Sequence, residues 1–188
     1  MTPNGDRIKM QDSMATMIWD GKKAMIVPDT SSEKGARFAL FTWSYFFASA
    51  YKLSDPGTNH KLLGEQILGD KKYTTSKLTF DENIGDTPDD WYVIYRKDSS
   101  NLMAAMVYIV TAGGTSQEEA EEDPHAITYE AYTEVEGVPI ATVWNFWDLN
   151  EQGEMEKLLG NAFIKNIRFI EETSGDMFDV GDKKALTS

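Results

Sequence analysis

The chain has 188 residues, with 18 Lys and Arg against 31 Asp and Glu, which gives a formal net charge of −13 at pH 7. A chain of this length forms one or two domains, and its 41% hydrophobic content is sufficient for a folded core. The negative charge opposes binding to nucleic acid, because that binding requires basic residues to displace counterions. The absence of cysteine excludes disulfides, thiolate catalysis and cysteine-ligated metals.

No segment is predicted to span a membrane. The longest strongly apolar stretch, residues 38–53, is interrupted by polar residues such as Lys52. It is also shorter than the roughly 20 apolar residues that a spanning helix needs. The chain opens without a basic region followed by an apolar segment, so we expect any export signal to lie outside it.

The first third of the chain predicts a hairpin followed by a helix. Residues 13–19 and 22–27 flank Asp20-Gly21, a dipeptide that is typical of tight hairpin turns. Residues 37–53 carry aromatic side chains at helical spacing on two faces, which indicates a helix that is buried on most sides. The turn-forming residues at 54–58 end that helix.

The remainder of the chain predicts an antiparallel sheet built from hairpins. The expected strands are residues 61–68, 73–80, 91–96, 102–111, 126–133, 138–147 and 163–170. Both arms of the hairpin at 91–111 are apolar on both faces, so we expect the sheet to be covered on each side. Loops are expected at 81–90 and 112–124, and a loose tail at 175–188. No repeat or linker divides the chain, which predicts a single domain over residues 1–174.

The two histidines are the candidate catalytic groups, although neither belongs to a recognised catalytic motif. His60 and His125 lie in turn-rich segments, and the chain has no nucleophile elbow, phosphate-binding loop or zinc-protease helix. A small hydrolase that pairs one histidine with carboxylates of the 81–90 loop stays an alternative, because catalytic triads are assembled in space. The five carboxylates of that loop do not follow the spacing of a calcium loop, and we interpret them as turn residues. We therefore expect no metal and no cofactor.

Aromatic residues are more numerous than a small antiparallel sheet needs for packing. They favour either an ordinary core or an apolar cavity for a hydrophobic ligand at the mouth of a curved sheet. The candidate ligand-binding residues are Trp43, Phe46, Phe47, Trp91, Met106 and Trp144. A protein-interaction module that uses an exposed part of the strand at 144–147 is a further alternative.

Several segments resemble an uncharacterised family of exported proteins from Gram-negative bacteria. The segments are residues 38–53, Asp55-Pro56-Gly57-Thr58, Lys77-Leu78-Thr79-Phe80, Gly85-Asp86-Thr87-Pro88-Asp89-Asp90-Trp91-Tyr92, Tyr95 and residues 138–147. At the level of fold, that family is similar to the periplasmic carriers of lipoproteins and lipids. In these carriers a curved antiparallel sheet forms a half-barrel, with helices packed on its concave side.

The resemblance covers residues 15–172 and carries several expectations. It implies a mainly β (α+β) fold and a location in the periplasm, or at the outer membrane through a lipid anchor. It implies a non-enzymatic protein that binds or carries a hydrophobic small molecule, a lipid or the acyl chain of a lipoprotein. Members of the family begin with a helix and strand upstream of the point where this chain starts, so we expect a short or N-terminally trimmed member.

Overall fold

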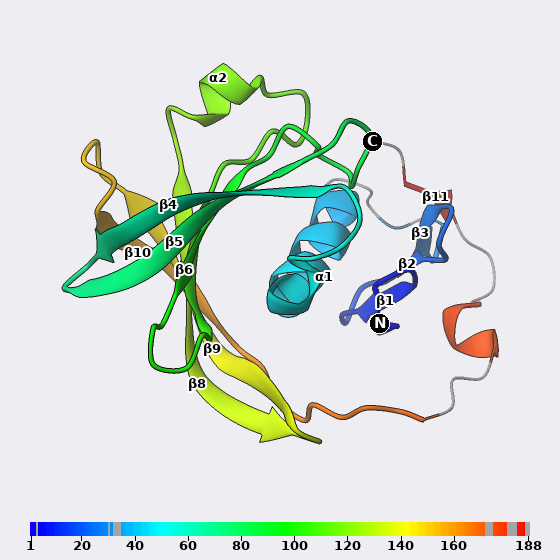
Figure 1. Ribbon diagram of the computed structural model, residues 1–188. Helices are drawn as coiled ribbons and strands as arrows, with labels where there is room; N and C mark the ends of the chain where they lie inside the picture. The colour runs from blue at the N-terminus through cyan, green and yellow to red at the C-terminus, as the bar shows by residue number, and fades with distance from the viewer. Residues whose placement is uncertain (3, 30, 32–34, 172–174, 180–183, 187–188) are drawn as a thin grey trace. The chain divides into compact units, whose positions relative to one another are not determined.

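Figure 1 shows the computed structural model, which describes residues 1–2, 4–29, 31, 35–171, 175–179 and 184–186. The described chain is mainly β, with two antiparallel sheets and two α-helices. It forms two compact units: unit 1 contains Met1–Ser54 and Ile170–Ser188, and unit 2 contains Asp55–Phe169. The single domain predicted over residues 1–174 includes parts of both units.

Unit 1 consists of a four-stranded antiparallel sheet, in the order β1-β2-β3-β11, and one long helix. Its elements are β1 (Ile8–Gln11), β2 (Thr16–Trp19), β3 (Ala24–Val27), β11 (Lys184–Ala185) and α1 (Ala36–Lys52). The predicted hairpin is confirmed as β2 and β3. Its turn is fixed by Asp20, whose Oδ1 accepts hydrogen bonds of 2.8 Å from the backbone N–H groups of Lys22 and Lys23.

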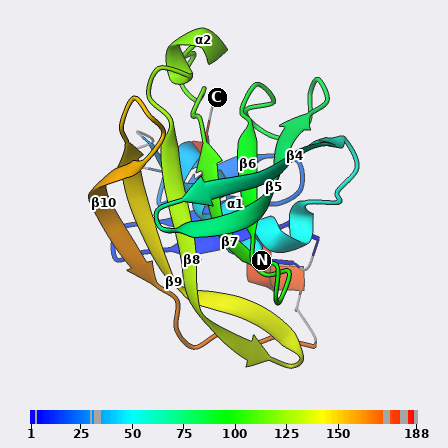
Figure 2. The same ribbon diagram turned by 60° about the vertical axis from the view of Figure 1, so that its left-hand side comes forward.

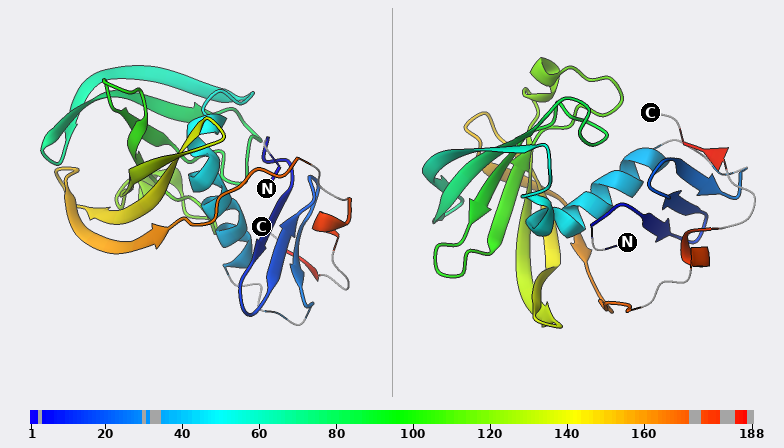
Figure 3. Two further views of the ribbon diagram at one scale, coloured as in Figure 1. Left: turned by 90° about the horizontal axis from the view of Figure 1, so that it is seen from below. Right: turned by 45° about the vertical axis from the view of Figure 1, so that its right-hand side comes forward.

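Each face of the unit 1 sheet packs against another element of the same unit. Helix α1 lies along one face (Figure 3), where its residue Leu40 belongs to a buried cluster. The strand and C-terminal members of this cluster are Ile8, Met17, Ala24, Ile26 and Leu186. On the other face, Ile18 and Met25 contact Phe178 of the 3-10 helix η1 (Gly175–Phe178). The described part of the tail that was predicted to be loose therefore supplies buried side chains, because Phe178 and Leu186 are each only 6% exposed.

Helix α1 occupies the predicted segment, and most of its residues are buried or half-buried as expected, although several of its aromatic side chains are exposed. Leu40 and Phe46 are buried, at 0% and 4% exposure. Three aromatic side chains of the same helix are exposed by 41–52%, and these are Phe38, Trp43 and Tyr51. Apolar periodicity identifies the faces of a helix that can be buried, but it does not set how many of them are covered.

Unit 2 is a seven-stranded antiparallel sheet in which each strand pairs with the next one in the sequence. Its strands are β4 (Thr58–Leu68), β5 (Lys71–Phe80), β6 (Tyr92–Arg96), β7 (Met103–Tyr108), β8 (His125–Val135), β9 (Val138–Leu149) and β10 (Met155–Phe163). The sheet is strongly curved, and Figure 2 shows the β4–β5 hairpin crossing the direction of β8 and β9. Strands β4 and β10 are its two free edges, so the sheet is not closed.

Two predictions for unit 2 require correction. The strand predicted at 163–170 is wrong, because the last strand of the sheet is β10 and residues 164–170 form no strand. Most residues of this edge strand are exposed, so its sequence lacks the apolar alternation that marks a half-buried strand. The loop predicted at 112–124 contains a one-turn helix, α2 (Gln117–Ala120), which is capped by the Ser116 hydroxyl.

Candidate functional site

Strand register defines the two faces of the unit 2 sheet. Cross-strand partners point to the same face, and successive residues along a strand alternate between faces. Met106 pairs with Ile94 and Ile127, and we call the face that carries these three side chains the Met106 face. The next residue, Val107, pairs with Ala126 on the opposite side of the sheet, and we call that side the Val107 face.

The Val107 face has a hydrophobic core of its own within unit 2. Its buried residues are Leu68, Tyr95, Ala105, Val107 and Ala126, and Tyr73, Trp91, Val93, Trp147, Leu149 and Met155 pack against them. The cluster joins the end of the β4–β5 hairpin to the start of β10. A Cβ atom at Gly69 would lie 3.4 Å from Cε of Met155, which shows how closely the two ends of the curved sheet approach.

The Met106 face is apolar across five neighbouring strands, from β5 to β9. Its most deeply buried side chains are Leu78, Ile94, Met106 and Ile127 at 0% exposure and Trp144 at 2%. The ring of Trp144 contacts Tyr129 edge to face, with 5.9 Å between the ring centres. These side chains therefore form a continuous, buried apolar layer over the centre of the sheet.

The structure places two of the predicted ligand-binding residues, Met106 and Trp144, on the same face of the sheet. Trp91 belongs to the core of the opposite face. Its indole N–H donates a 2.7 Å hydrogen bond to Oε1 of Glu121, and Nζ of Lys77 lies 4.3 Å from its ring centre. A site on the Met106 face therefore does not include Trp91, because the sheet itself separates the two.

The other three predicted ligand-binding residues, Trp43, Phe46 and Phe47, belong to α1 in unit 1. Phe46 and Phe47 follow Trp43 by three and four positions, so both lie on the same side of the helix as Trp43. Phe46 is buried, Phe47 is partly buried and Trp43 is 41% exposed. Their participation in a ligand site stays a prediction.

The strand at 144–147 does not form the exposed patch that an interaction module was expected to use. Trp144 is buried, and its Nε1 donates a 3.1 Å hydrogen bond to the carbonyl oxygen of Ala141. Trp147 packs into the core of the Val107 face. The exposed large apolar side chains on the strands of unit 2 lie on the edge strands β4 and β10, and they are Leu62, Ile67, Leu158, Leu159 and Phe163.

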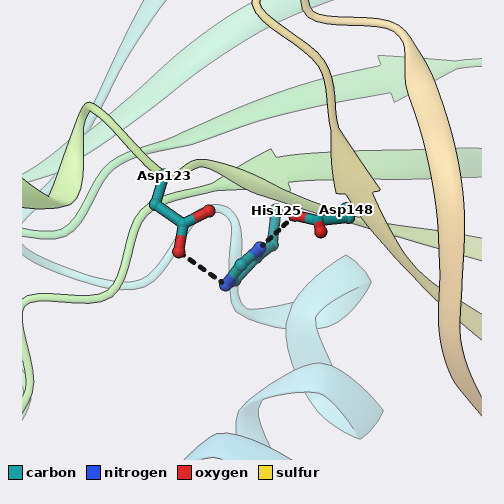
Figure 4. Close-up of side chains that lie close together, drawn as sticks. All are labelled: Asp123, His125 and Asp148. Atoms are coloured by element: carbon teal, nitrogen blue, oxygen red, sulfur yellow. Dashed lines mark ion pairs between the residues drawn. The ribbon is translucent and has the colours of Figure 1, made fainter.

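A polar cluster of one imidazole and two carboxylates lies where β8 begins and β9 ends (Figure 4). His125 pairs directly with Asp148 across the two strands, and Asp123 precedes His125 by two residues. Nδ1 of His125 lies 3.8 Å from Oδ1 of Asp148, and its Nε2 lies 4.0 Å from Oδ2 of Asp123. One ligand atom from each of the three residues lies within 4.8 Å of the others, so the cluster is a candidate metal centre.

The surroundings of His125 are partly buried and aromatic. The side chain is 27% exposed, and Nδ1 is buried without a hydrogen-bond partner among the described residues. The imidazole meets the ring of Tyr108 edge to face, with 6.0 Å between the ring centres. Burial raises the pKa of Tyr108 to about 12, because a phenolate would lose its hydration there. The tyrosine beside the cluster is therefore a neutral phenol at physiological pH.

The acidic loop at 81–90 has a structural role at its last carboxylate. Asp90 is 7% exposed, and its Oδ1 accepts two 2.8 Å hydrogen bonds, from the backbone N–H and the hydroxyl of Thr111. Its Oδ2 accepts a 2.6 Å hydrogen bond from the hydroxyl of Thr87. The interpretation of these carboxylates as turn residues is confirmed at Asp90.

The hydrolase alternative receives no support from the arrangement around the histidines. Among the described residues, the carboxylates near His125 are Asp123 and Asp148, and none comes from the 81–90 loop. His60 lies on an exposed stretch of β4, where it pairs with Leu78.

Sequence reasoning singled out His125 but missed both carboxylates beside it. The signal that would reveal Asp148 is the turn at Glu136-Gly137, where both residues have positive φ angles of 51° and 81°. Such two-residue turns join adjacent antiparallel strands in a fixed register. Counting outward from this turn pairs His125 with Asp148.

None of the described helices is long and apolar enough to cross a membrane.

Comparison with known proteins gives one match, to a family model. No curated protein and no solved structure matches the chain. The model of a family of unknown function, DUF6503, matches residues 20–158, which confirms the expectation of an uncharacterised family. The chain therefore belongs to the DUF6503 family.

Proposed function

We propose that this protein binds and carries a hydrophobic ligand, such as a lipid or the acyl chain of a lipoprotein, without catalysing a reaction. The observation that supports the proposal is the apolar Met106 face, which extends over five strands of a curved sheet. Curved antiparallel sheets are suited to this task because their concave surface can surround a small apolar molecule.

The side chains of the Met106 face suit a ligand of this kind. Removing apolar surface from water contributes about 25 cal/mol per Å², or about 0.8 kcal/mol for each buried methylene group. Met106 stands at the centre of the face, and the unbranched, polarisable methionine side chain adapts to ligands of different shape. Trp144 adds a large rigid ring on the same face.

In this role the sheet of unit 2 acts as a half-barrel that is open between β4 and β10. The protein then acts in the periplasm or at the outer membrane. The support for that location is the resemblance of the sequence to exported proteins, and the support for the carrier role is the likeness of that family to periplasmic lipid and lipoprotein carriers.

Extraction of the purified full chain into organic solvent, followed by mass spectrometry, tests the proposal. We expect either a co-purifying lipid or, after extraction and refolding, saturable binding of a fluorescent fatty acid by the folded protein. The same protein unfolded in urea is the control, because it should not bind the probe saturably. The absence of both a bound lipid and saturable binding by the folded chain would overturn the proposal.

A further inference from the structure

We propose that Asp123, His125 and Asp148 bind one divalent transition-metal ion, such as Zn²⁺. This site is independent of the hydrophobic-ligand function, and all three of its residues belong to unit 2. It also departs from the expectation that the chain uses no metal.

The distances in the cluster favour a shared ion over direct hydrogen bonds. The two imidazole–carboxylate separations, 3.8 and 4.0 Å, are longer than the roughly 2.7–3.2 Å of an N–H···O hydrogen bond. Two ligand atoms that each lie about 2.1 Å from a tetrahedral zinc ion are about 3.4 Å apart. The two separations start at different ring nitrogens, but one ligand atom from each of the three residues lies within 4.8 Å of the others. Side-chain rotations would bring these three atoms into coordination range of one ion.

Strand pairing holds two of the ligands and leaves the third accessible. His125 and Asp148 are direct partners in the β8–β9 ladder, so their backbones are fixed relative to each other. The side chain of Asp123, on the segment that enters β8, is 76% exposed. It can therefore close over an ion that reaches the site from solvent.

The hydrogen-bonding state of His125 points to a missing ligand. Its Nδ1 is buried and has no hydrogen-bond partner among the described residues, although buried polar atoms are nearly always satisfied. A cation bound at Nδ1 would satisfy this atom and would lie on the side of the ring that faces Asp148. The two carboxylates of the cluster supply the anionic oxygen ligands that a divalent cation requires.

The chemistry of the ligand set selects the class of ion. Imidazole nitrogen favours Zn²⁺ and neighbouring transition metals, whereas Ca²⁺ and Mg²⁺ favour sites composed of oxygen ligands. One nitrogen and two oxygens therefore favour Zn²⁺ over Ca²⁺. Three protein ligands also leave a coordination position for water.

Calorimetric titration of the EDTA-treated full chain with Zn²⁺ and with Ca²⁺ tests this site. The variants are His125→Gln and Asp148→Asn, and His60→Gln is the matched control because it removes the other histidine of the chain. We expect one Zn²⁺ per chain, with affinity at least about tenfold weaker in both site variants and changed less than about twofold in the control. Circular dichroism verifies that each variant is folded.

Three outcomes would overturn the site. They are Zn²⁺ binding that is unchanged in His125→Gln, Zn²⁺ binding that weakens equally in His60→Gln, and tighter binding of Ca²⁺ than of Zn²⁺. A folded Asp148→Asn variant with wild-type affinity would also exclude the carboxylate as a ligand. None of these outcomes bears on lipid binding, which the extraction experiment measures separately.

Discussion

His125 and Asp148 face each other across β8 and β9, with Nδ1 of the imidazole 3.8 Å from Oδ1 of the carboxylate. On its other side, His125 pairs with Tyr108 of β7, and Tyr108 pairs with Tyr92 of β6. A row of aromatic rings therefore leads from β6 to the polar cluster. This row lies on the Met106 face. Unit 2 therefore combines an extended, buried apolar layer with a polar cluster at one end of the same face of the sheet.

Zinc should stabilise the folded protein through this cluster. A ligand that binds only the folded state stabilises it by about 2.7 kcal/mol when its free concentration is 100 times its dissociation constant. Urea unfolding with and without Zn²⁺ should show this gain in the wild-type chain and in His60→Gln, and no gain in His125→Gln. An equal gain in His125→Gln would mean that the stabilising ion binds elsewhere.

Tyr108 should make stability fall at high pH. Unfolded tyrosine loses its proton near pH 10, whereas burial raises the pKa of Tyr108 to about 12 in the folded chain. The stability that this tyrosine contributes is therefore fully present below pH 10 and is lost as the pH rises towards 12. The loss should be about 2–3 kcal/mol, at about 1.4 kcal/mol for each unit of pKa.

Urea unfolding of the wild-type chain and of Tyr108→Phe, followed from pH 9 to 12, measures this contribution. Phenylalanine keeps the aromatic ring without the ionisable hydroxyl, so the variant should lose less stability over this range. If the unfolding free energies of the two proteins fall in parallel over this pH range, burial does not raise the pKa of Tyr108.

Asp90→Ala should destabilise the chain by about 2–4 kcal/mol, because it leaves the buried donors of Thr111 without their acceptor. Asp81→Ala in the same loop is the control. Asp81 is exposed and accepts a single hydrogen bond from Asn59, so its loss should cost less than about 1 kcal/mol. Equal shifts of the urea midpoint for the two variants would contradict the structural role of Asp90.

Gly57→Ala should be more damaging than Gly114→Ala. Both glycines have left-handed backbones, with φ of +84° and +89°, so alanine costs about 1–2 kcal/mol at either position. A Cβ at Gly57 would also lie 2.5 Å from Cγ1 of Ile84, whereas a Cβ at Gly114 meets no atom within 4 Å. The steric contact should add about 1–3 kcal/mol at Gly57.

Thermal or urea unfolding of the two glycine variants provides the comparison. The double variant Gly57→Ala, Ile84→Ala removes the side chain that the new methyl group would meet. The double variant should therefore lose less unfolding free energy than the sum of the losses in the two single variants. Strict additivity would show that Ile84 is not the source of the added cost.

Most of the fold could be predicted from the sequence because its hairpins carry strong local signals. The Asp20-Gly21 turn and the apolar strands at 91–96 and 102–111 each specify their own structure. Strand β10 could not be predicted in the same way. It is an exposed edge strand whose position depends on its pairing with β9, and its own sequence carries little of that information.

The candidate sites could be predicted only in part, because they depend on register. Side chains alternate between the faces along each strand, and this places Met106 and Trp144 on one face and Trp91 on the other. A register shift of one residue would move a side chain to the opposite face. His125 was visible as one of two histidines, but Asp148 joins it only after the β8–β9 turn is known to contain two residues.

If the Met106 face binds a hydrophobic ligand, two variants of β7 should differ in their binding of a fluorescent fatty acid. Met106→Ala and Val107→Ala alter adjacent buried residues on opposite faces of one strand. Each truncation should lower stability, by about 2–5 kcal/mol for methionine and somewhat less for valine, so both proteins are first verified as folded. We predict that Met106→Ala weakens probe binding at least about tenfold, equivalent to about 1.4 kcal/mol, and that Val107→Ala leaves it near the wild-type value. Equal affinities in the two folded variants, or no saturable binding by the wild-type chain, would mean that the Met106 face does not bind the ligand.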